Sequence, residues 1–255
     1  MPGFASYPSL RDRAVFISGG GSGIGASMVE HFAQQGAKVA FVDIDEAASQ
    51  ALSAKLAAAG CPQPLFQKCD VRDIAAYQAA LAELARRLGP FTVLVNNAAR
   101  DDRHTLEEVT AAYWDERLAV NLRHQFFAIQ SLAPGMKQAG GGSIINFSSV
   151  SYHAMTANLA VYQAAKAAVI GLTRGLARDL GPFKIRLNAI TPGWIMTQRQ
   201  IDLWLTPEAE AGLIRAQCLK EKLYPPDIAR MALWLAADDS RLVTAQNFVV
   251  DGGRM

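Results

Sequence analysis

Short apolar runs rich in β-branched residues alternate with longer, Ala- and Leu-rich stretches along the whole chain. The longer stretches have the length of helices, as at 24–35, 47–59 and 74–88, and glycine or proline follows their ends. Seven short runs have the length and composition of strands, at 14–18, 38–43, 65–69, 92–96, 143–148, 185–190 and 247–251. Such alternation is typical of parallel strands joined by crossover helices that cover both faces of a sheet. We therefore expect an α/β fold with a doubly wound, seven-stranded parallel sheet.

The chain of 255 residues has no linker and no shift in composition that would divide it. We therefore expect a single Rossmann-type domain over residues 1–255, with a lid over the substrate at about 194–220. In a doubly wound sheet, ligands bind at the carboxyl ends of the strands. Functional residues are expected at that edge.

Charge and cysteine content exclude several classes of protein. The 25 Lys and Arg residues nearly balance the 23 Asp and Glu residues, and no basic block occurs, so neither nucleic acid nor a membrane surface is an expected partner. Residues 139–165 lack charged side chains, but polar residues interrupt them, so they do not read as a membrane span. The three cysteines are odd in number and widely spaced, which argues against disulfides and favours a reducing, cytoplasmic location. Histidine and cysteine spacing predicts no metal site.

A glycine-rich turn directly follows the first predicted strand. The segment 19–25 reads Gly-Gly-Gly-Ser-Gly-Ile-Gly and leads into a predicted helix. Glycines there let the backbone turn tightly and approach a pyrophosphate, which lies at the amide groups and positive end of the helix. The turn therefore predicts a dinucleotide cofactor.

Acidic residues end the second and third predicted strands. Asp43 is placed to accept hydrogen bonds from the adenosine ribose hydroxyls, and its charge would repel a 2′-phosphate, which predicts NAD rather than NADP. The alternative is that Asp43 caps the next helix, a role that Asp45 could fill instead. Asp70 and Val71 are placed to meet the adenine, although Asp70 could be only a helix cap.

Tyr162 and Lys166 lie four residues apart, so on a helix they share one face. A phenol has an ordinary pKa near 10 and is too weak a base at neutral pH, but a nearby ammonium and the nicotinamide charge would lower that pKa. Ser149, at a strand end, precedes Tyr162 by thirteen residues. The three residues predict general acid–base chemistry on a hydroxyl or carbonyl group.

With these motifs the chain resembles the short-chain dehydrogenase/reductase family over essentially its whole length. The resemblance also includes Asn96-Asn97-Ala98, Asn121, Pro192-Gly193 and Thr197. It implies that Tyr162 is the general acid/base, that Lys166 lowers its pKa and bonds the nicotinamide ribose, and that Ser149 orients the substrate oxygen. Asn121 is then expected to hold a water of the proton relay, and Thr197 to contact the carboxamide.

The expected cofactor-binding residues combine the turn, the acids and the family motifs. They are Gly19, Ser22, Gly23, Ile24, Gly25, Asp43, Asp70, Val71, Asn97, Tyr162, Lys166, Pro192, Gly193, Ile195 and Thr197. Two positions depart from the family pattern: Ser18 stands where threonine is usual, and Ala99 where glycine is usual. The second departure affects only how closely the backbone approaches the cofactor there.

A narrower resemblance points to bacterial NAD-dependent aldose 1-dehydrogenases of the D-xylose type. It lies in five segments, at 7–10, 101–104, 113–117, 121–124 and 217–220. It implies that the chain oxidises the anomeric hydroxyl of a cyclic sugar to a lactone. The alternatives are a reductase of keto-deoxy sugar acids or 3-oxoacyl thioesters, and a catalytically inactive nucleotide-binding module. The presence of Ser149, Tyr162 and Lys166 disfavours the inactive module.

A sugar pocket should offer polar side chains around Ser149 and Tyr162. The candidates are Arg100, Asp101, Ser151, His153, Asn158, Trp194 and Gln198. Trp194 could stack on the apolar face of a pyranose ring or anchor the lid. Arg103 and His104 are interpreted as a surface or interface pair with Asp101 or Asp102.

Small residues recur every four positions in the helix that carries Tyr162, at Ala167, Gly171 and Gly175. Such a stripe lets another helix approach closely. On the opposite side, Val169, Leu172 and Leu176 are expected to face the sheet. The preceding long helix offers Leu118, Leu122, Phe126 and Ile129 to the same interface. Together with the family resemblance, this predicts a homodimer or homotetramer.

Overall fold

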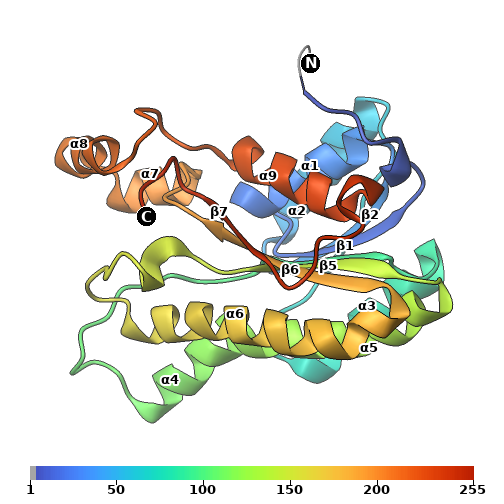
Figure 1. Cartoon of the computed structure of the whole chain (residues 1–255), viewed down its shortest axis with the longest axis horizontal. Coiled ribbons are helices and arrows are strands. Elements are labelled where there is room, and N and C mark those ends of the chain that lie inside the picture. The colour runs from blue at the N-terminus through green and yellow to red at the C-terminus, as the bar shows by residue number, and fades with distance from the viewer. Residues whose placement is uncertain (1–3) are drawn as a thin grey trace.

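The computed structural model describes residues 4–255 and contains one seven-stranded sheet. All strand pairs are parallel, and the strand order is β3-β2-β1-β4-β5-β6-β7 (Figure 1). The strands are β1 Ala14–Ser18, β2 Lys38–Asp43, β3 Leu65–Lys68, β4 Val93–Asn96, β5 Gly142–Phe147, β6 Ile185–Pro192 and β7 Asn247–Val250. The predicted α/β class and sheet are confirmed, and the predicted strand bounds are correct to within two residues.

Helices cover both faces of the sheet (Figure 1). They are α1 Gly23–Gln34, α2 Glu46–Ala58, α3 Ile74–Leu88, α4 Ala111–Leu118, α5 His124–Gln138, α6 Ala160–Leu180, α7 Gln198–Trp204, α8 Pro207–Ala216 and α9 Pro225–Ala236. Helices α1, α2 and α9 supply the hydrophobic cluster on one face, and α3, α5 and α6 supply the cluster on the other. A five-residue π-helix, Ala119–Arg123, joins α4 to α5. Between residues 4 and 255 no helix has both the length and the hydropathy that a membrane crossing requires.

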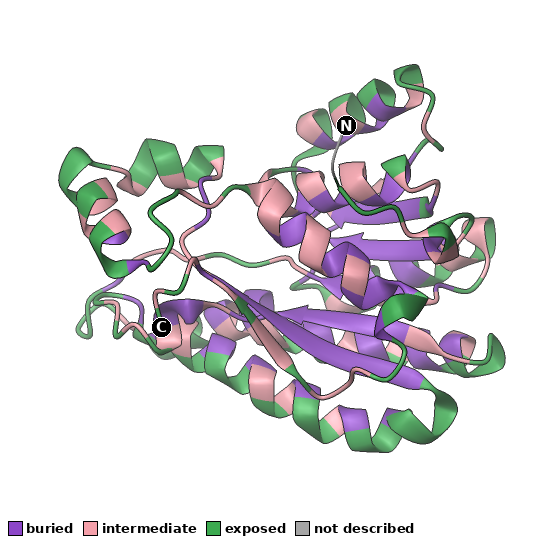
Figure 2. Ribbon diagram, turned by 45° about the horizontal axis from the view of Figure 1, so that its top comes forward, coloured by how far each residue is buried: buried purple, intermediate pink, exposed green. Residues whose placement is uncertain are grey.

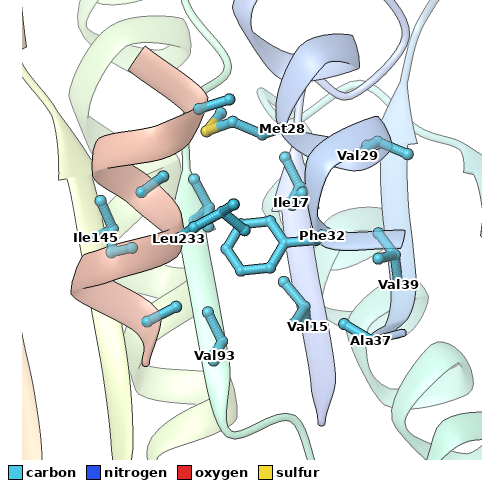
Figure 3. Close-up of a cluster of buried hydrophobic side chains, with 14 of the residues drawn as sticks. Val15, Ile17, Met28, Val29, Phe32, Ala37, Val39, Val93, Ile145 and Leu233 are labelled. Atoms are coloured by element: carbon cyan, nitrogen blue, oxygen red, sulfur yellow. The ribbon is translucent and has the colours of Figure 1, made fainter. Parts of the chain in front are cut away.

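The central strands β1, β4, β5 and β6 are almost entirely buried, as the purple ribbons of Figure 2 show, whereas the edge strands β3 and β7 are only partly buried. Every residue of β1 and of β6 is buried. On one face, Phe32 of α1 and Leu233 of α9 pack against Val15, Ile17 and Val93 of the central strands (Figure 3). Most strand residues therefore belong to the apolar core, and the strand residues that line the cavity lie at the strand ends.

The chain reverses its direction of winding between β1 and β4, which are neighbours in the sheet. Ser18 at the end of β1 is in register with Asn96 at the end of β4. The loops that follow these two strands lead to opposite faces of the sheet, which opens a crevice at this point. The loops after β5 and β6 and the short helices α7 and α8 border the same edge (Figure 1).

Replacing Leu233 by alanine should lower the free energy of unfolding by roughly 2–5 kcal/mol, because it leaves a cavity in the core between α9 and the sheet. Leu233 is 3% exposed, whereas Leu242 is 82% exposed. Leu242→Ala should therefore change the unfolding free energy by less than ~0.5 kcal/mol. Urea denaturation followed by circular dichroism measures both variants. Equal effects of the two substitutions would contradict the packing described above.

Candidate active site

The turn between β1 and α1 has room only for glycine at its critical positions. A Cβ atom on Gly25 would lie 1.7 Å from the carbonyl oxygen of Gly19, and one on Gly19 would lie 2.9 Å from the Cα of Ala98. Gly19 and Gly23 have φ angles of +67° and +53°, which disfavour side chains. The backbone therefore forms a close-packed cradle at the start of α1, and such a cradle fits a dinucleotide phosphate.

A cavity of about 1100 Å³ opens at the carboxyl ends of the strands. All fifteen residues expected to bind the cofactor line it: Gly19, Ser22, Gly23, Ile24, Gly25, Asp43, Asp70, Val71, Asn97, Tyr162, Lys166, Pro192, Gly193, Ile195 and Thr197. Typical small-molecule pockets measure roughly 300–1,000 Å³. The cavity is therefore large enough for a dinucleotide together with a small substrate.

Asp43 fixes the glycine turn against β2. Its Oδ2 accepts a hydrogen bond from the Gly21 amide at 2.8 Å, and its Oδ1 accepts one from the Asp45 amide at 3.0 Å. The N-cap of α2 is Asp45, which accepts from the amide of Ala48 at 3.0 Å. Asp43 is thus not the cap of α2, and its carboxylate lines the cavity.

Asp70 lies at the rim of the cavity in a cluster of charges. Arg72 donates to it at 2.5 Å and pairs with Glu116 at 2.6 Å. The hydrogen bonds from Arg72 hold the pKa of Asp70 below its ordinary value. The cap of α3 is Asp73, which accepts from the amide of Ala76. The alternative interpretation of Asp70 as a helix cap is therefore wrong.

Asn97 braces the turn from the neighbouring strand. Its Nδ2 donates to the carbonyl oxygens of Ser18 and Gly19 at 3.1 and 2.9 Å. In return, the Ser18 hydroxyl accepts from the amides of Asn97 and Ala98, both at 3.1 Å. The hydroxyl at position 18 therefore joins β1 to the β4 loop, so serine preserves the contact that the usual threonine offers.

Tyr162, Lys166 and Ser149 meet beside the cavity. Tyr162 and Lys166 lie one turn apart on α6, and the side chain of Ser149 lowers the pKa of Tyr162 and lines the same cavity. The Nζ of Lys166 donates to the carbonyl oxygen of Phe147 at 2.8 Å and lies 5.6 Å from the centre of the Tyr162 ring. The loop after β5 and the first turns of α6 thus bring a hydroxyl, a phenol and an amine together.

In the chain without a bound cofactor, the pKa of Tyr162 is not lowered in the way that its spacing from Lys166 predicts. Burial raises the pKa of Tyr162 above its ordinary value, and the charge of Asp101 raises it further, against the opposing effects of Ser149 and Arg103. The same burial lowers the pKa of Lys166 to about 7. Residue spacing predicted that Tyr162 and Lys166 lie close together, but it does not show the burial that sets the pKa of both groups.

Asn121 lies in the π-helix and is fully buried. Its Oδ1 accepts from the Arg100 amide at 2.9 Å, and its Nδ2 donates to the carbonyl oxygens of Arg100 and Arg117 at 3.0 and 2.9 Å. Asn121 is not among the lining residues of the cavity. Its side chain therefore positions the loop after β4, and a role in holding water stays a prediction.

Most of the proposed substrate-binding side chains line the cavity: Arg100, Asp101, Ser151, Asn158, Trp194 and Gln198. The Ser151 hydroxyl is buried and has no hydrogen-bond partner among residues 4–255. His153 was a wrong prediction. Its side chain is exposed outside the cavity, and its ring lies 3.9 Å from that of Tyr152. The turn after Ser151 directs it away from the site.

The interpretation of Arg103 and His104 as a surface or interface pair is also wrong. His104 is buried, contacts the Tyr113 hydroxyl through Nδ1 at 3.0 Å, and accepts from the Val161 amide through Nε2 at 3.3 Å. It therefore positions the first turn of α6, directly before Tyr162. Arg103 lines the cavity, and its guanidinium lies 4.9 Å from the Trp204 ring centre.

Sequence reasoning missed several residues that line the cavity, among them Arg199, Gln200, Trp204 and Arg254. The first three belong to α7 and contact the loop after β4, as in the pairing of Arg199 with Asp102 at 2.9 Å. Their sequence positions carry no motif. Only the folded arrangement brings α7 over the cavity.

Comparisons with known proteins agree with this geometry. The family model described as "Enoyl-(Acyl carrier protein) reductase" matches residues 19–254. D-xylose 1-dehydrogenase of Caulobacter vibrioides is 49% identical over 249 residues, which cover 98% of each chain. The probable galactose dehydrogenase GalD of Rhizobium meliloti is 52% identical over 249 residues, covering 98% of this chain and 97% of that protein.

Solved structures share the fold over nearly the whole chain. A 3-oxoacyl-[acyl-carrier protein] reductase from Brucella melitensis has a TM-score of 0.91 at 33% identity, covering 98% of this chain and 94% of its own. A 7α-hydroxysteroid dehydrogenase solved with NADH and a 7-oxo bile acid has a TM-score of 0.91 at 30% identity, covering 96% of each chain. Family model, relatives and site geometry agree: the chain belongs to the short-chain dehydrogenase/reductase family.

Proposed function

We propose that the protein is an NAD⁺-dependent sugar dehydrogenase that oxidises the anomeric hydroxyl of an aldose to the lactone. The observation that carries the proposal is the meeting of Ser149, Tyr162 and Lys166 beside a cavity that the glycine cradle also lines. The sugar substrate is supported by two relatives about half identical over 98% of this chain, named D-xylose 1-dehydrogenase and probable galactose dehydrogenase.

Oxidation of the anomeric hydroxyl removes a hydride and a proton from the sugar, and different groups of the site receive them. The nicotinamide of NAD⁺, when bound, supplies the hydride acceptor. Ser149 orients the anomeric hydroxyl by a hydrogen bond, and the Tyr162 oxygen, in its ionised form, takes the hydroxyl proton. Because burial raises the pKa of Tyr162, nearby positive charge has to stabilise this ionised form.

Lys166 supplies a positive charge close to the Tyr162 ring. One of its three N–H groups is held by the Phe147 carbonyl, which fixes the amine 5.6 Å from the phenol ring. Its remaining N–H groups are available to the nicotinamide ribose. Lys166 therefore combines an electrostatic role with a cofactor-binding one.

The substrate test compares aldoses, polyols and 3-hydroxyacyl thioesters with NAD⁺, and keto sugar acids and 3-oxoacyl thioesters with NADH. A pentose or hexose should exceed the thioesters in kcat/KM by at least ~100-fold, because polar pocket groups left unpaired by an apolar substrate discriminate strongly. Tyr162→Phe should lower kcat by roughly 10²- to 10⁴-fold. A preference for the thioesters would favour the alternative function as a 3-oxoacyl thioester reductase. If no compound of the panel is turned over, the catalytically inactive nucleotide-binding module would be favoured.

Tyr7→Phe is a matched control for this substitution, because Tyr7 lies on the N-terminal segment away from the cavity. It should leave kcat unchanged. NADH binding, followed by fluorescence, should survive in both variants, since neither removes a residue of the glycine cradle. Near-normal turnover in Tyr162→Phe would refute the assigned acid–base role.

We further propose that NAD, not NADP, is the cofactor, because the Asp43 carboxylate lines the cavity beside the glycine turn. A ribose hydroxyl can donate to this carboxylate, whereas a 2′-phosphate would be repelled by about 4 kcal/mol per charge pair at ~4 Å and an effective dielectric near 20. The neighbouring cations are engaged by acids: Lys68 pairs with Glu46 at 3.2 Å, and Arg72 with Asp70 and Glu116.

Wild-type kcat/KM should accordingly be at least ~100-fold higher with NAD⁺ than with NADP⁺, since each ~1.4 kcal/mol corresponds to a factor of ten. Asp43→Ala should largely abolish this ratio. Asp73→Ala removes a capping carboxylate outside the cavity and should leave the ratio unchanged. Steady-state kinetics with both cofactors measures the ratios, and equal wild-type efficiencies would exclude a role of Asp43 in cofactor choice.

We propose that the protein assembles as a homodimer or homotetramer through α5 and α6. Ala167 is exposed, and within residues 4–255 no atom outside the neighbouring α6 backbone lies within 4 Å of a Cβ placed on Gly171 or Gly175, so the stripe can receive another helix. Phe126 of α5 is 39% exposed beside it. Ile129 is buried in the core and does not belong to this surface. We propose a cytoplasmic location as well, which the three free thiols support because they fit a reducing compartment.

Light scattering at micromolar concentration should give a mass of at least twice 27.5 kDa. Gly171→Glu should lower that mass, because it puts a bulky charge into the proposed contact. Gly181→Glu is the control, since Gly181 also has open space around it but lies at the end of α6. A wild-type mass of a single chain would contradict the proposal.

A further inference from the structure

A chain of hydrogen bonds crosses the substrate end of the cavity. The Nε1 of Trp194 donates to the Oε1 of Gln200 at 2.8 Å, and the Nε2 of Gln200 donates to the Oδ2 of Asp101 at 2.7 Å. Trp194 follows β6, Gln200 belongs to α7, and Asp101 lies on the loop after β4. All three side chains line the cavity. The loop after β4 is thus joined at one wall to the segment 194–200, which lies about a hundred residues further along the chain.

Gln200 fixes the other two side chains. Its amide oxygen is used by the indole and its amide nitrogen by the carboxylate, so rotation of the amide would break both bonds. The indole plane of Trp194 and the carboxylate of Asp101 are therefore held in a defined relation to each other. No motif or neighbouring residue in the sequence indicates this arrangement.

Asp101 retains capacity to accept further hydrogen bonds. A carboxylate offers about four acceptor positions. Among residues 4–255, its side-chain partners are Gln200 and, at 3.5 Å from Oδ1, the Nε of Arg199. Its side chain is 20% exposed. A half-buried carboxylate with free acceptor positions favours a ligand that brings several hydroxyl donors.

We propose that Asp101, Gln200 and Trp194 form the sugar-recognition wall of the active site. Asp101 accepts hydrogen bonds from substrate hydroxyls other than the one oxidised, Trp194 offers its ring to the C–H face of the sugar, and Gln200 is the positioning residue that holds both. This inference rests on the proposed function, because it assigns the residues that would select a sugar at the same site.

The charges around Tyr162 support a location of Asp101 next to the reacting atoms. The charge of Asp101 raises the pKa of both Tyr162 and Lys166, whereas the guanidinium of Arg103 lowers that of Tyr162. The other polar groups facing the phenol are Ser149 on the loop after β5 and Lys166 on α6. Arg199 and Arg254 line the same cavity. A substrate placed between Tyr162 and Asp101 would therefore contact both.

The recognition test uses Asp101→Asn, which keeps the size of the side chain and an oxygen for Gln200 but removes the charge. Its kcat/KM for the preferred aldose should fall by roughly ten- to a hundredfold, mainly through KM, because hydrogen bonds to charged acceptors are the strong ones. Asp115→Asn makes the same change on the exposed face of α4 and should have no effect.

Monodeoxy analogues of the same aldose locate the contact. At one position at least, removing the hydroxyl should weaken wild-type kcat/KM by about tenfold or more and should have little effect in Asp101→Asn. Equal penalties in the two enzymes at every position would overturn the assignment of Asp101. A wild type that oxidises no aldose would overturn the proposed function as well, so the two failures are distinct.

Gln200→Leu tests the positioning role. It should raise KM for the aldose as Asp101→Asn does, and the double variant should be little worse than either single one, because both act through the same contact. Additive losses would show that Gln200 acts independently of Asp101. NADH affinity should be unchanged, since none of the three residues belongs to the glycine cradle.

The pH dependence of kcat/KM separates an electrostatic role of Asp101 from a purely structural one. A purely structural role would leave it unshifted. Asp101 raises the pKa of Tyr162, so Asp101→Asn should shift the acidic limb of kcat/KM to lower pH. Arg103 lowers that pKa, so Arg103→Gln should shift the same limb to higher pH. If the acidic limb shifts in the same direction in both variants, or shifts in neither, these charges lie away from the phenol. Either outcome would overturn the proposed wall.

Discussion

Burial of the parallel sheet on both faces is the constraint on which the rest of the structure depends. Because helices cover each face, most interior residues of the central strands are apolar, and the residues that line the cavity lie where the strands end. The reversal between β1 and β4 then separates the loops at that end and opens the cavity. The position of the site thus follows from the topology before any catalytic residue is considered.

Backbone bracing holds the site at this edge. Asn97 ties the glycine turn to β4, Asn121 fixes the loop that carries Asp101, and His104 receives the amide of Val161 beside Tyr162. None of the three acts by its charge. Each uses a buried or partly buried side chain to satisfy main-chain groups that a loop would otherwise leave unpaired. Their common effect is to order loops around a cavity that would otherwise be lined by mobile segments.

The sequence could reveal those parts of the site that depend on local pattern. The glycine turn, Asp43, Ser149 and the Tyr162–Lys166 pair were predictable, because each lies at a strand end or on one helical face. The contacts of α7 with the loop after β4 were not, because they join residues about a hundred positions apart. The same holds for His104, whose buried role needs the start of α6 beside it. The pKa of Tyr162 in the chain without cofactor was not predictable, because residue spacing shows a neighbouring charge but not desolvation.

The double use of Asp43 has a consequence for how this lineage can evolve. The carboxylate that faces the cavity also accepts the amide of Gly21, so one side chain both lines the site and supports the turn. If Asp43 sets the coenzyme preference as proposed, replacing it by an aliphatic residue would change that preference and also remove the acceptor of the Gly21 amide. Coenzyme choice and support of the turn would then be coupled through one side chain.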